Sequence, residues 1–300
     1  MEIRARLCQA DPVLERLEPD SRGVLRTPLP GSWQLLRWHP SAAARPYVAW
    51  YWAVRWDLAA GHGHDQATLP HPSAHLVVDG AVALVHGPRS RRFERRLEGS
   101  GRTVGVRFRP GGIRPLLGAP VASITDRTVA AGALRGHGGA GLDGGLDGAA
   151  LAHDVGRHAD ADAAACALDA ALRPLLPADP HPSIALADHA VRLLAEDPEL
   201  FRVADLADRL RLSVRSLQRL FTEYVGLGPA VVRRRYRLQE VAAEALRGEP
   251  VDWGQLAATL GYYDQAHLVR DFTATVGTPP ARYAASRQGG QSGSAPPART

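Results

Sequence analysis

Two stretches in the last third of the chain repeat one pattern of residues. The first copy reads Leu206-Ala207, Leu210, Leu212, Leu217, Arg219, Phe221, Gly226 and Pro229. The second copy reads Leu256-Ala257, Leu260, Tyr262, Leu268, Arg270, Phe272, Gly277 and Pro279. The offset is 50 residues before the turn and 51 in the helix that follows it. A repeat of this length indicates a supersecondary unit that occurs twice, which constrains the fold more than any other feature.

Each copy has the residue order of a helix-turn-helix. In the first copy, Leu206 and the small Ala207 form the inner face of a short helix that a second helix can cross closely. The Ser213 hydroxyl ends the turn and can cap the second helix by accepting a free backbone N–H. Leu217 and Phe221 then anchor that helix on the core. Its outer face is left to Val214, Arg215, Gln218 and Arg219.

The second copy repeats this arrangement around the turn Gly261-Tyr262-Tyr263-Asp264. Asp264 suits the N-cap position because its carboxylate also complements the helix dipole. Between the copies, residues 229–246 start with Pro and are followed closely by Gly248, which predicts one connecting helix. The outer face of the second recognition helix would carry Gln265, Ala266, His267, Val269 and Arg270.

From Ser183 to Tyr283 the chain resembles the AraC/XylS family of bacterial transcriptional regulators. The densest stretch is Leu260-Gly261-Tyr262-Tyr263-Asp264-Gln265-Ala266-His267-Leu268-Val269-Arg270-Asp271-Phe272, followed by Gly277-Thr278-Pro279 and Tyr283. The resemblance implies two helix-turn-helix units joined by a long helix and bound to successive major-groove segments. Two positions depart from the family pattern: Gly228 replaces the usual Ser or Thr before Pro, and Trp253 replaces an aliphatic residue.

The resemblance also implies a set of DNA-contacting residues. These are Arg215, Gln218, Arg219, Gln265, His267 and Arg270. To this set we add Ser213 at the start of the first recognition helix and Arg234 and Arg235 on the connecting helix. We expect Arg219 and Arg270 to read guanine in the groove, and Arg234 and Arg235 to hold backbone phosphate. The alternative is that Arg219 or Arg270 also holds phosphate, or pairs with Glu223 or Asp271 to brace the fold.

Charge is distributed unevenly along the chain. Residues 1–125 and 201–300 carry net charges of +7 and +5, whereas residues 126–200 carry −7. All 36 basic side chains are Arg, which suits phosphate and guanine recognition. A GC-rich coding sequence explains the absence of Lys better, so only the charge asymmetry favours a nucleic-acid partner.

Residues 33–125 show the alternation of β strands. Trp50, Trp52 and Trp56 share one face of the strand that spans residues 47–56, and Asp79-Gly80 predicts a hairpin turn. The Trp residues are typical either of an aromatic-lined ligand pocket or of a barrel core, and strand periodicity alone favours the core. This half also resembles the front domains of some regulators of the family, which implies effector sensing or dimerisation.

The predicted fold class is α+β: a small β-barrel or sandwich-like domain followed by an all-α domain with two helix-turn-helix motifs. We expect the β domain at 1–125, a Gly-rich linker plus helix at 126–182, and the DNA-binding domain at 183–285. A tail at 286–300, rich in Ser, Gly, Pro and Gln, is expected to be disordered.

Other function classes find little support. No Gly-x-Ser-x-Gly, His-Glu-x-x-His or phosphate-cradling loop is present, so we expect no enzyme, catalytic residue or cofactor. His62 and His64 lack the third ligand of a metal site, which favours a polar loop. The Arg run at 89–96 favours a solvated hairpin over an anion or DNA contact. Two cysteines, no secretory signal and no long apolar run predict a cytoplasmic protein without a membrane partner.

The function that these features favour is a sequence-specific transcriptional regulator acting on double-stranded promoter or operator DNA. A small-molecule effector, RNA polymerase and a second copy of the chain are candidate further partners. The alternative is a ligand- or partner-binding protein whose helical half docks protein instead of DNA.

Overall fold

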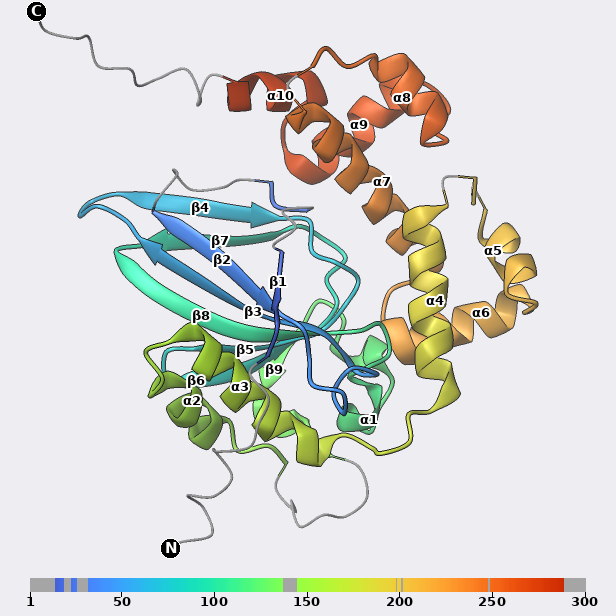
Figure 1. Ribbon diagram of the computed structural model, residues 1–300. Coiled ribbons are helices and arrows are strands. Elements are labelled where there is room, and N and C mark those ends of the chain that lie inside the picture. The colour runs from blue at the N-terminus through green and yellow to red at the C-terminus, as the bar shows by residue number, and fades with distance from the viewer. Residues whose placement is uncertain are drawn as a thin grey trace, which may run out of the picture.

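The N-terminal half of the chain is built on two antiparallel β-sheets (Figure 1). The computed structural model describes residues 14–18, 23–25, 32–136, 145–197, 199–200, 202–247 and 249–288. Its strands are β1 (Arg16–Leu17), β2 (Trp33–Trp38), β3 (Val48–Asp57), β4 (Gly63–Thr68), β5 (His75–Asp79), β6 (Val82–His86), β7 (Phe93–Glu98), β8 (Ser100–Phe108) and β9 (Thr128–Ala130). The larger sheet has the order β1-β2-β3-β8-β5-β6-β9, and β4 pairs with β7 over it. This confirms the predicted sandwich-like β domain.

The long strand β3 separates two different environments. Tyr51 and Ala53 are fully buried, in one cluster with residues of α2 (Gly148–Gly156) and α3 (Ala161–Leu172). Trp50 and Trp52 point to the opposite face, toward the two-stranded sheet, and are only half-buried. Strand alternation therefore assigns one face of β3 to the helix-packed core and the other to the space between the sheets.

The N-terminal domain extends past the expected boundary at residue 125. β9 pairs with β6, and Leu151, Val155 and Leu168 are buried in the same cluster as the strands. The described residues 126–136 and 145–182 thus complete this domain rather than link it to the next, because the sheet needs α2 and α3 to cover its outer face. The predicted hairpin between β5 and β6 is present, but its two-residue loop is shifted by one residue to Gly80-Ala81. Asp79 pairs with Val82, and Gly80 has a positive φ of 58°.

The C-terminal half is helical, as predicted. The short helix α1 (Arg114–Leu117) belongs to the N-terminal half. The helices of the C-terminal half are α4 (Pro182–Glu196), α5 (Val203–Arg209), α6 (Val214–Leu220), α7 (Pro229–Leu246), α8 (Trp253–Thr259), α9 (Gln265–Val276) and α10 (Pro280–Gln288). The connecting helix α7 begins and ends at the predicted residues and lies between the two helix-turn-helix units in Figure 1.

The two units repeat their backbone contacts as well as their residues. Leu212 N–H donates to Ala207 carbonyl over 2.9 Å, and Tyr262 N–H donates to Ala257 carbonyl over 2.9 Å. Both turns contain a left-handed residue, Arg211 (φ 56°) in the first and Gly261 (φ 68°) in the second. The equal geometry confirms that the sequence repeat encodes one structural unit twice.

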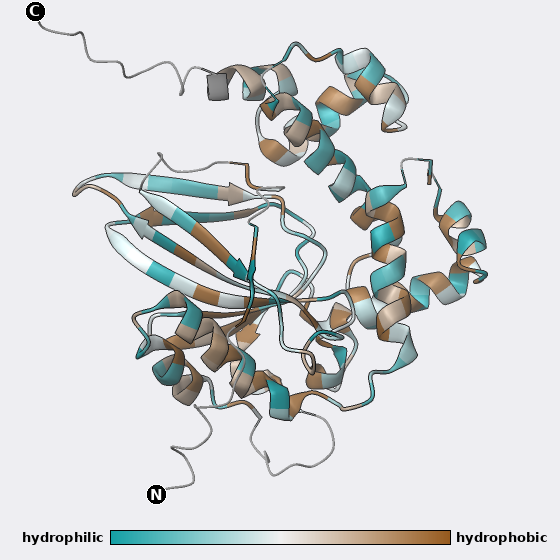
Figure 2. Cartoon of the chain, viewed as in Figure 1, coloured by the Kyte–Doolittle hydropathy of each residue, from teal (hydrophilic) through white to brown (hydrophobic). Residues whose placement is uncertain are grey.

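Each unit has its own apolar core. Leu206, Leu217 and Phe221 are buried in the first unit, and Leu268 and Phe272 in the second. Figure 2 shows hydrophobic and hydrophilic colours mixed along these helices, as expected for helices that pack on one side.

Some expectations fall outside the described residues: Cys8, residues 137–144 of the Gly-rich stretch, and residues 289–300 of the tail. Residues 286–288 continue α10. In the described part of the chain, no helix combines the length and hydrophobicity needed to cross a bilayer.

Candidate DNA-binding face and ligand cavity

The outer face of α6 carries the residues predicted for it. Ser213 is the N-cap, and its Oγ accepts from the Ser216 N–H over 3.1 Å. Arg215, Gln218 and Arg219 are exposed. Since Leu217 is fully buried beneath them, the cap and the anchor together direct the three polar side chains to solvent.

The outer face of α9 matches it. Asp264 is the N-cap and accepts from the His267 N–H over 2.6 Å. Gln265, His267 and Arg270 are exposed, and the His267 ring contacts the edge of Tyr262 with centroids 5.2 Å apart. Val269 is the exception, because it is half-buried against the second core instead of facing outward.

Arg219 and Arg270 do not brace the fold through the acids considered for them. Glu223 pairs with Arg114 over 2.5 Å, and Asp271 pairs with Arg234 over 2.5 Å. Tyr262 also donates to Asp271 over 3.0 Å. Within the described ranges neither Arg219 nor Arg270 has an ion-pair partner. Their guanidinium groups are therefore available to a partner outside the chain.

The neighbours Arg234 and Arg235 on α7 lie in opposite environments. The Arg234 side chain is 48% exposed and also donates to Thr275 over 3.0 Å. Arg235 is only 4% exposed. In this arrangement Arg235 cannot hold a DNA phosphate, contrary to expectation, because the N-terminal domain covers it.

The Arg235 guanidinium is bound to main-chain carbonyls of the N-terminal domain. It donates to Pro70 over 3.1 Å, to Arg89 over 3.0 Å and to Ser90 over 2.7 Å. Burial lowers the pKa of Arg235 to about 10. The carbonyl cluster satisfies the buried donors, so this side chain joins the two domains.

Further contacts hold the second helix-turn-helix unit on the same domain. Gln239 donates to Leu69 carbonyl over 2.8 Å, and the Tyr283 hydroxyl donates to Leu25 carbonyl over 2.9 Å. Leu25 and Leu69 are buried in the apolar core of that unit. The interface therefore combines apolar packing with buried hydrogen bonds.

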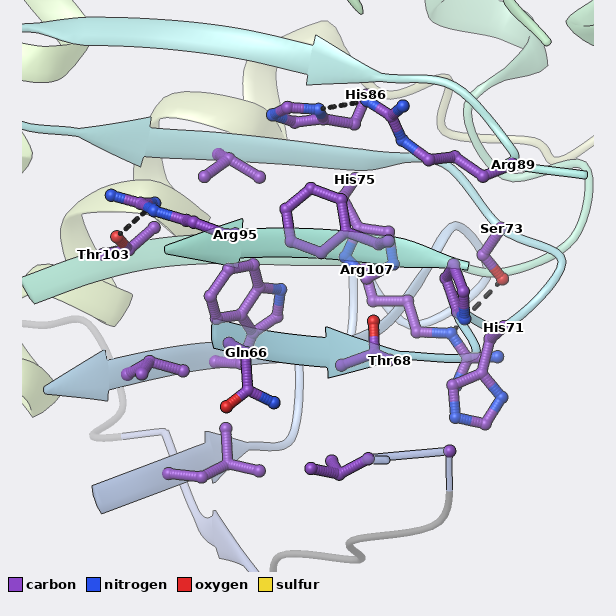
Figure 3. Close-up of a pocket in the computed structure, with 18 of the residues that line it drawn as sticks. Gln66, Thr68, His71, Ser73, His75, His86, Arg89, Arg95, Thr103 and Arg107 are labelled. Carbon is purple, nitrogen blue, oxygen red and sulfur yellow. Dashed lines mark hydrogen bonds between the residues drawn. The ribbon is translucent and has the colours of Figure 1, made fainter. Parts of the chain in front are cut away.

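A cavity of about 590 Å³ lies between the two sheets of the N-terminal domain (Figure 3). Its wall includes Trp50, Trp52 and Trp56, with further aromatic and aliphatic side chains. These further side chains include Trp33, Leu35, Val54, Leu69, Val77, Leu84, Phe93 and Leu97. The favoured interpretation, a Trp stripe in a solid core, was wrong in that the stripe borders an open space. The size is typical of small-molecule sites.

Glycines on β8 make room for the Trp side chains. A Cβ at Gly105 would lie 2.6 Å from the Trp52 ring, and one at Gly101 would lie 2.2 Å from the Trp56 ring. β8 pairs with β3, so these glycines sit directly across from the two indoles. Without a Cβ at these two positions, the indole rings can approach the backbone of β8 closely.

The sequence interpretation missed the basic end of the cavity. Arg37 of β2 and Arg107 of β8 line the wall and are buried, at 9% and 7% exposure. His75 of β5 lies beside them, and burial together with the charge of Arg107 lowers the pKa of His75 to about 3. The signal was present in the period-2 alternation, because Arg107 follows Gly101 and Gly105 on one face of β8.

The Arg run at 89–96 is not simply a solvated hairpin. Arg89 and Arg95 line the cavity, and Arg92 donates to the Val276 carbonyl of the helical half. The described residues contain no cluster of three or more His, Cys, Asp or Glu side chains that could hold a metal ion. His62 lies in a loop, whereas His71 and His75 belong to the cavity wall.

Comparison with known family models also separates a β-rich N-terminal part of the chain from a helical C-terminal part. Residues 206–286 match the family model described as a helix-turn-helix domain, and residues 36–130 match a domain of unknown function, DUF6597. No curated protein matches the chain.

Solved structures give looser likenesses. A probable AraC family transcriptional regulator from Rhodopseudomonas palustris CGA009 is 23% identical, with 33% of this chain and 97% of that one covered and a TM-score of 0.28. ToxT from Vibrio cholerae is 11% identical, with 84% and 98% covered and a TM-score of 0.41. A ToxT structure with bound unsaturated fatty acid is 10% identical, with 86% and 97% covered and a TM-score of 0.37.

The identification depends on the matched domain and its geometry. Two capped helix-turn-helix units with equivalent turns flank one long helix behind a β domain. The matched domain belongs to regulators and not to a known enzyme family. The chain carries a helix-turn-helix domain over residues 206–286, as DNA-binding transcriptional regulators of the AraC/XylS type do.

Proposed function

We propose that the chain reads adjacent major-groove segments of promoter DNA with the outer faces of α6 and α9. Arg219 and Arg270 pair with guanine, and Arg215, Gln218, Gln265 and His267 contact neighbouring bases or phosphates. The Ser213 cap holds the N-terminal end of α6 at the groove. The observation that carries the proposal is that Arg219 and Arg270 occupy equivalent exposed positions while the nearby acids pair with other arginines.

Arg234 contributes differently in this proposal. It lies on α7 and not on a recognition helix, so we assign it to backbone phosphate. Its pairing with Asp271 would have to open when DNA binds. RNA polymerase and a second copy of the chain are the protein partners to test, and a promoter partner would place the protein in the bacterial cytoplasm.

The cavity of the N-terminal domain is the proposed effector site. Leu69, Pro70 and Arg89 line the cavity, and their carbonyls accept hydrogen bonds from Gln239 or Arg235 of α7. A ligand that shifts these wall segments would therefore act directly on the helix between the two DNA-reading units. This supports a regulator whose DNA binding responds to a small molecule.

The test starts with selection of bound sequences from random duplex DNA by the full chain. Arg219→Ala, Arg270→Ala and the control Arg234→Ala are then measured on the selected operator, single-base mismatches and random DNA. We expect the first two variants to lose about 1–3 kcal/mol of discrimination at one base each. Arg234→Ala should weaken binding to all sequences alike and lower the salt slope by about 1.

Two results would contradict the proposal. Equal losses on operator and random DNA for Arg219→Ala and Arg270→Ala, with the melting temperature unchanged, would make both residues phosphate clamps. Wild-type affinity that does not change between low and physiological salt would favour the alternative in which the helical half docks protein.

A further inference from the structure

Arg107 places a positive charge inside the cavity with no carboxylate at ion-pair distance among the described residues. Its side chain is 7% exposed, and Nε donates to Ser73 Oγ over 3.2 Å (Figure 3). A buried charge of this kind is costly unless a counter-charge reaches it.

Arg37, the other charged group at this end of the cavity, is also positive and cannot neutralise the charge of Arg107. The guanidinium carbons of Arg107 and Arg37 lie 4.1 and 4.8 Å from the centre of the Trp50 ring. The indole is thus contacted by two cations, and this attraction offsets only part of their burial cost. Burial also lowers the pKa of Arg107 to about 10, and the charge of Arg37 adds to that effect. Tyr236 and Asp188, which pairs with Arg109, oppose it.

The two carboxylates that line the cavity already form ion pairs with other arginines. Asp79 pairs with Arg95 over 2.9 Å and accepts from Thr103 over 3.2 Å. Glu94 pairs with Arg92 over 2.9 Å. Figure 3 shows Arg95 and Thr103 toward one end of the cavity and Arg107 with Ser73 toward the other. The end around Arg107 therefore carries surplus positive charge.

The rest of the wall offers apolar contact. Trp52 and Trp56 pack closely against glycines of β8, and aliphatic side chains complete the surface. A ligand that fits this wall has an anionic head and an apolar body. The planar guanidinium matches a carboxylate, which can accept two parallel hydrogen bonds from it.

We propose, building on the effector site above, that the cavity binds a carboxylate with an aromatic or aliphatic body. The carboxylate sits on Arg107, with Arg37 adding to the positive field, and the body lies against Trp52 and Trp56. A neutral ligand of the same shape leaves the Arg107 charge uncompensated and binds more weakly.

The experiment uses the full chain and matched probe pairs. Phenylbutanoate, indole-3-butanoate, decanoate and dodecanoate are compared with their primary amides by thermal shift and by tryptophan fluorescence. At least one acid should raise the melting temperature and change the fluorescence saturably. Its amide should bind at least about tenfold more weakly, because a charge-assisted pair is lost.

Two variants locate the head group. Arg107→Gln should weaken the binding acid by at least about tenfold and bring it to the level of its amide. The matched control Arg96→Gln replaces an exposed arginine of β7 that does not line the cavity and pairs with Asp65 and Glu98, and it should change acid affinity by less than about threefold. The comparison of acid with amide on the wild-type protein holds even if a variant fails to fold.

Three results overturn the inference: no acid in the series binds, amides bind as tightly as acids, or Arg107→Gln keeps the preference for the acid. A salt series of DNA binding by the wild-type chain without ligand separates this outcome from failure of the regulator proposal. Salt-dependent DNA binding with no acid bound refutes the ligand class alone. Acid binding without DNA binding refutes DNA recognition alone.

Discussion

Replacing Arg235 by Met tests whether α7 is held on the rim of the cavity. Methionine keeps an unbranched, flexible chain but removes the donors that reach the carbonyls of Pro70, Arg89 and Ser90. Losing three charge-assisted hydrogen bonds would cost about 4–9 kcal/mol. The lowered pKa of Arg235, about 10, shows that burying its charge costs about 3 kcal/mol. The neutral Met avoids this cost, so the net loss is smaller by that amount. We therefore expect Arg235→Met to lose about 1–6 kcal/mol of unfolding free energy.

The adjacent residue provides the control. The Arg234 side chain is 48% exposed, and its partner Asp271, at 13% exposure, keeps the hydrogen bond from Tyr262 when Arg234 is removed. Arg234→Met should cost no more than about 1 kcal/mol. Urea unfolding, followed by tryptophan fluorescence and by circular dichroism, measures both variants. If they lose the same stability, or if Arg235→Met loses less than about 1 kcal/mol, the Arg235 contact does not join the domains.

Two further predictions concern the first recognition helix and the cavity wall. Ser213→Ala removes the N-cap of α6 and should cost about 1 kcal/mol in urea unfolding; an unchanged midpoint would contradict the capping role. The pKa of His75 is about 3 in the folded chain and 6.5 unfolded, so the unfolded state binds the proton first as the pH falls below 6.5. Stability should therefore drop by about 2 kcal/mol between pH 7 and pH 5 on account of this group. The His75→Gln variant should therefore lose about 2 kcal/mol less stability than the wild type between pH 7 and pH 5. An identical pH dependence in the variant would refute the lowered pKa of His75.

The helix-turn-helix units could be predicted because their determinants are local. The caps Ser213 and Asp264 act on N–H groups three residues away. Leu217 and Phe272 are buried as the helical period requires. These interactions recur in both copies, so the repeat determined the exposed faces of α6 and α9, apart from Val269. Pro229 and Gly248 determined the boundaries of α7.

The domain boundary could not be predicted in the same way. The Gly-rich composition around 132–148 indicated a linker, yet β9 and α2 belong to the N-terminal core. Composition indicates how flexible a segment is by itself. Whether the segment packs in a core depends on which apolar sheet face it meets, and composition does not show that. The Trp stripe of β3 was ambiguous for a related reason, since alternation shows that a face is apolar but not whether another side chain fills the space beside it.

The sequence by itself determined the repeated fold of the DNA-reading half and the two faces of β3. Only the tertiary structure decided the roles of Arg107 and of the adjacent pair Arg234 and Arg235. Arg235 donates to carbonyls 145 and 146 residues away in sequence, and one helical step turns Arg234 to the surface instead. The physical reason is that side-chain periodicity is a property of a few residues, whereas burial of a charge depends on which distant backbone meets that face of the helix.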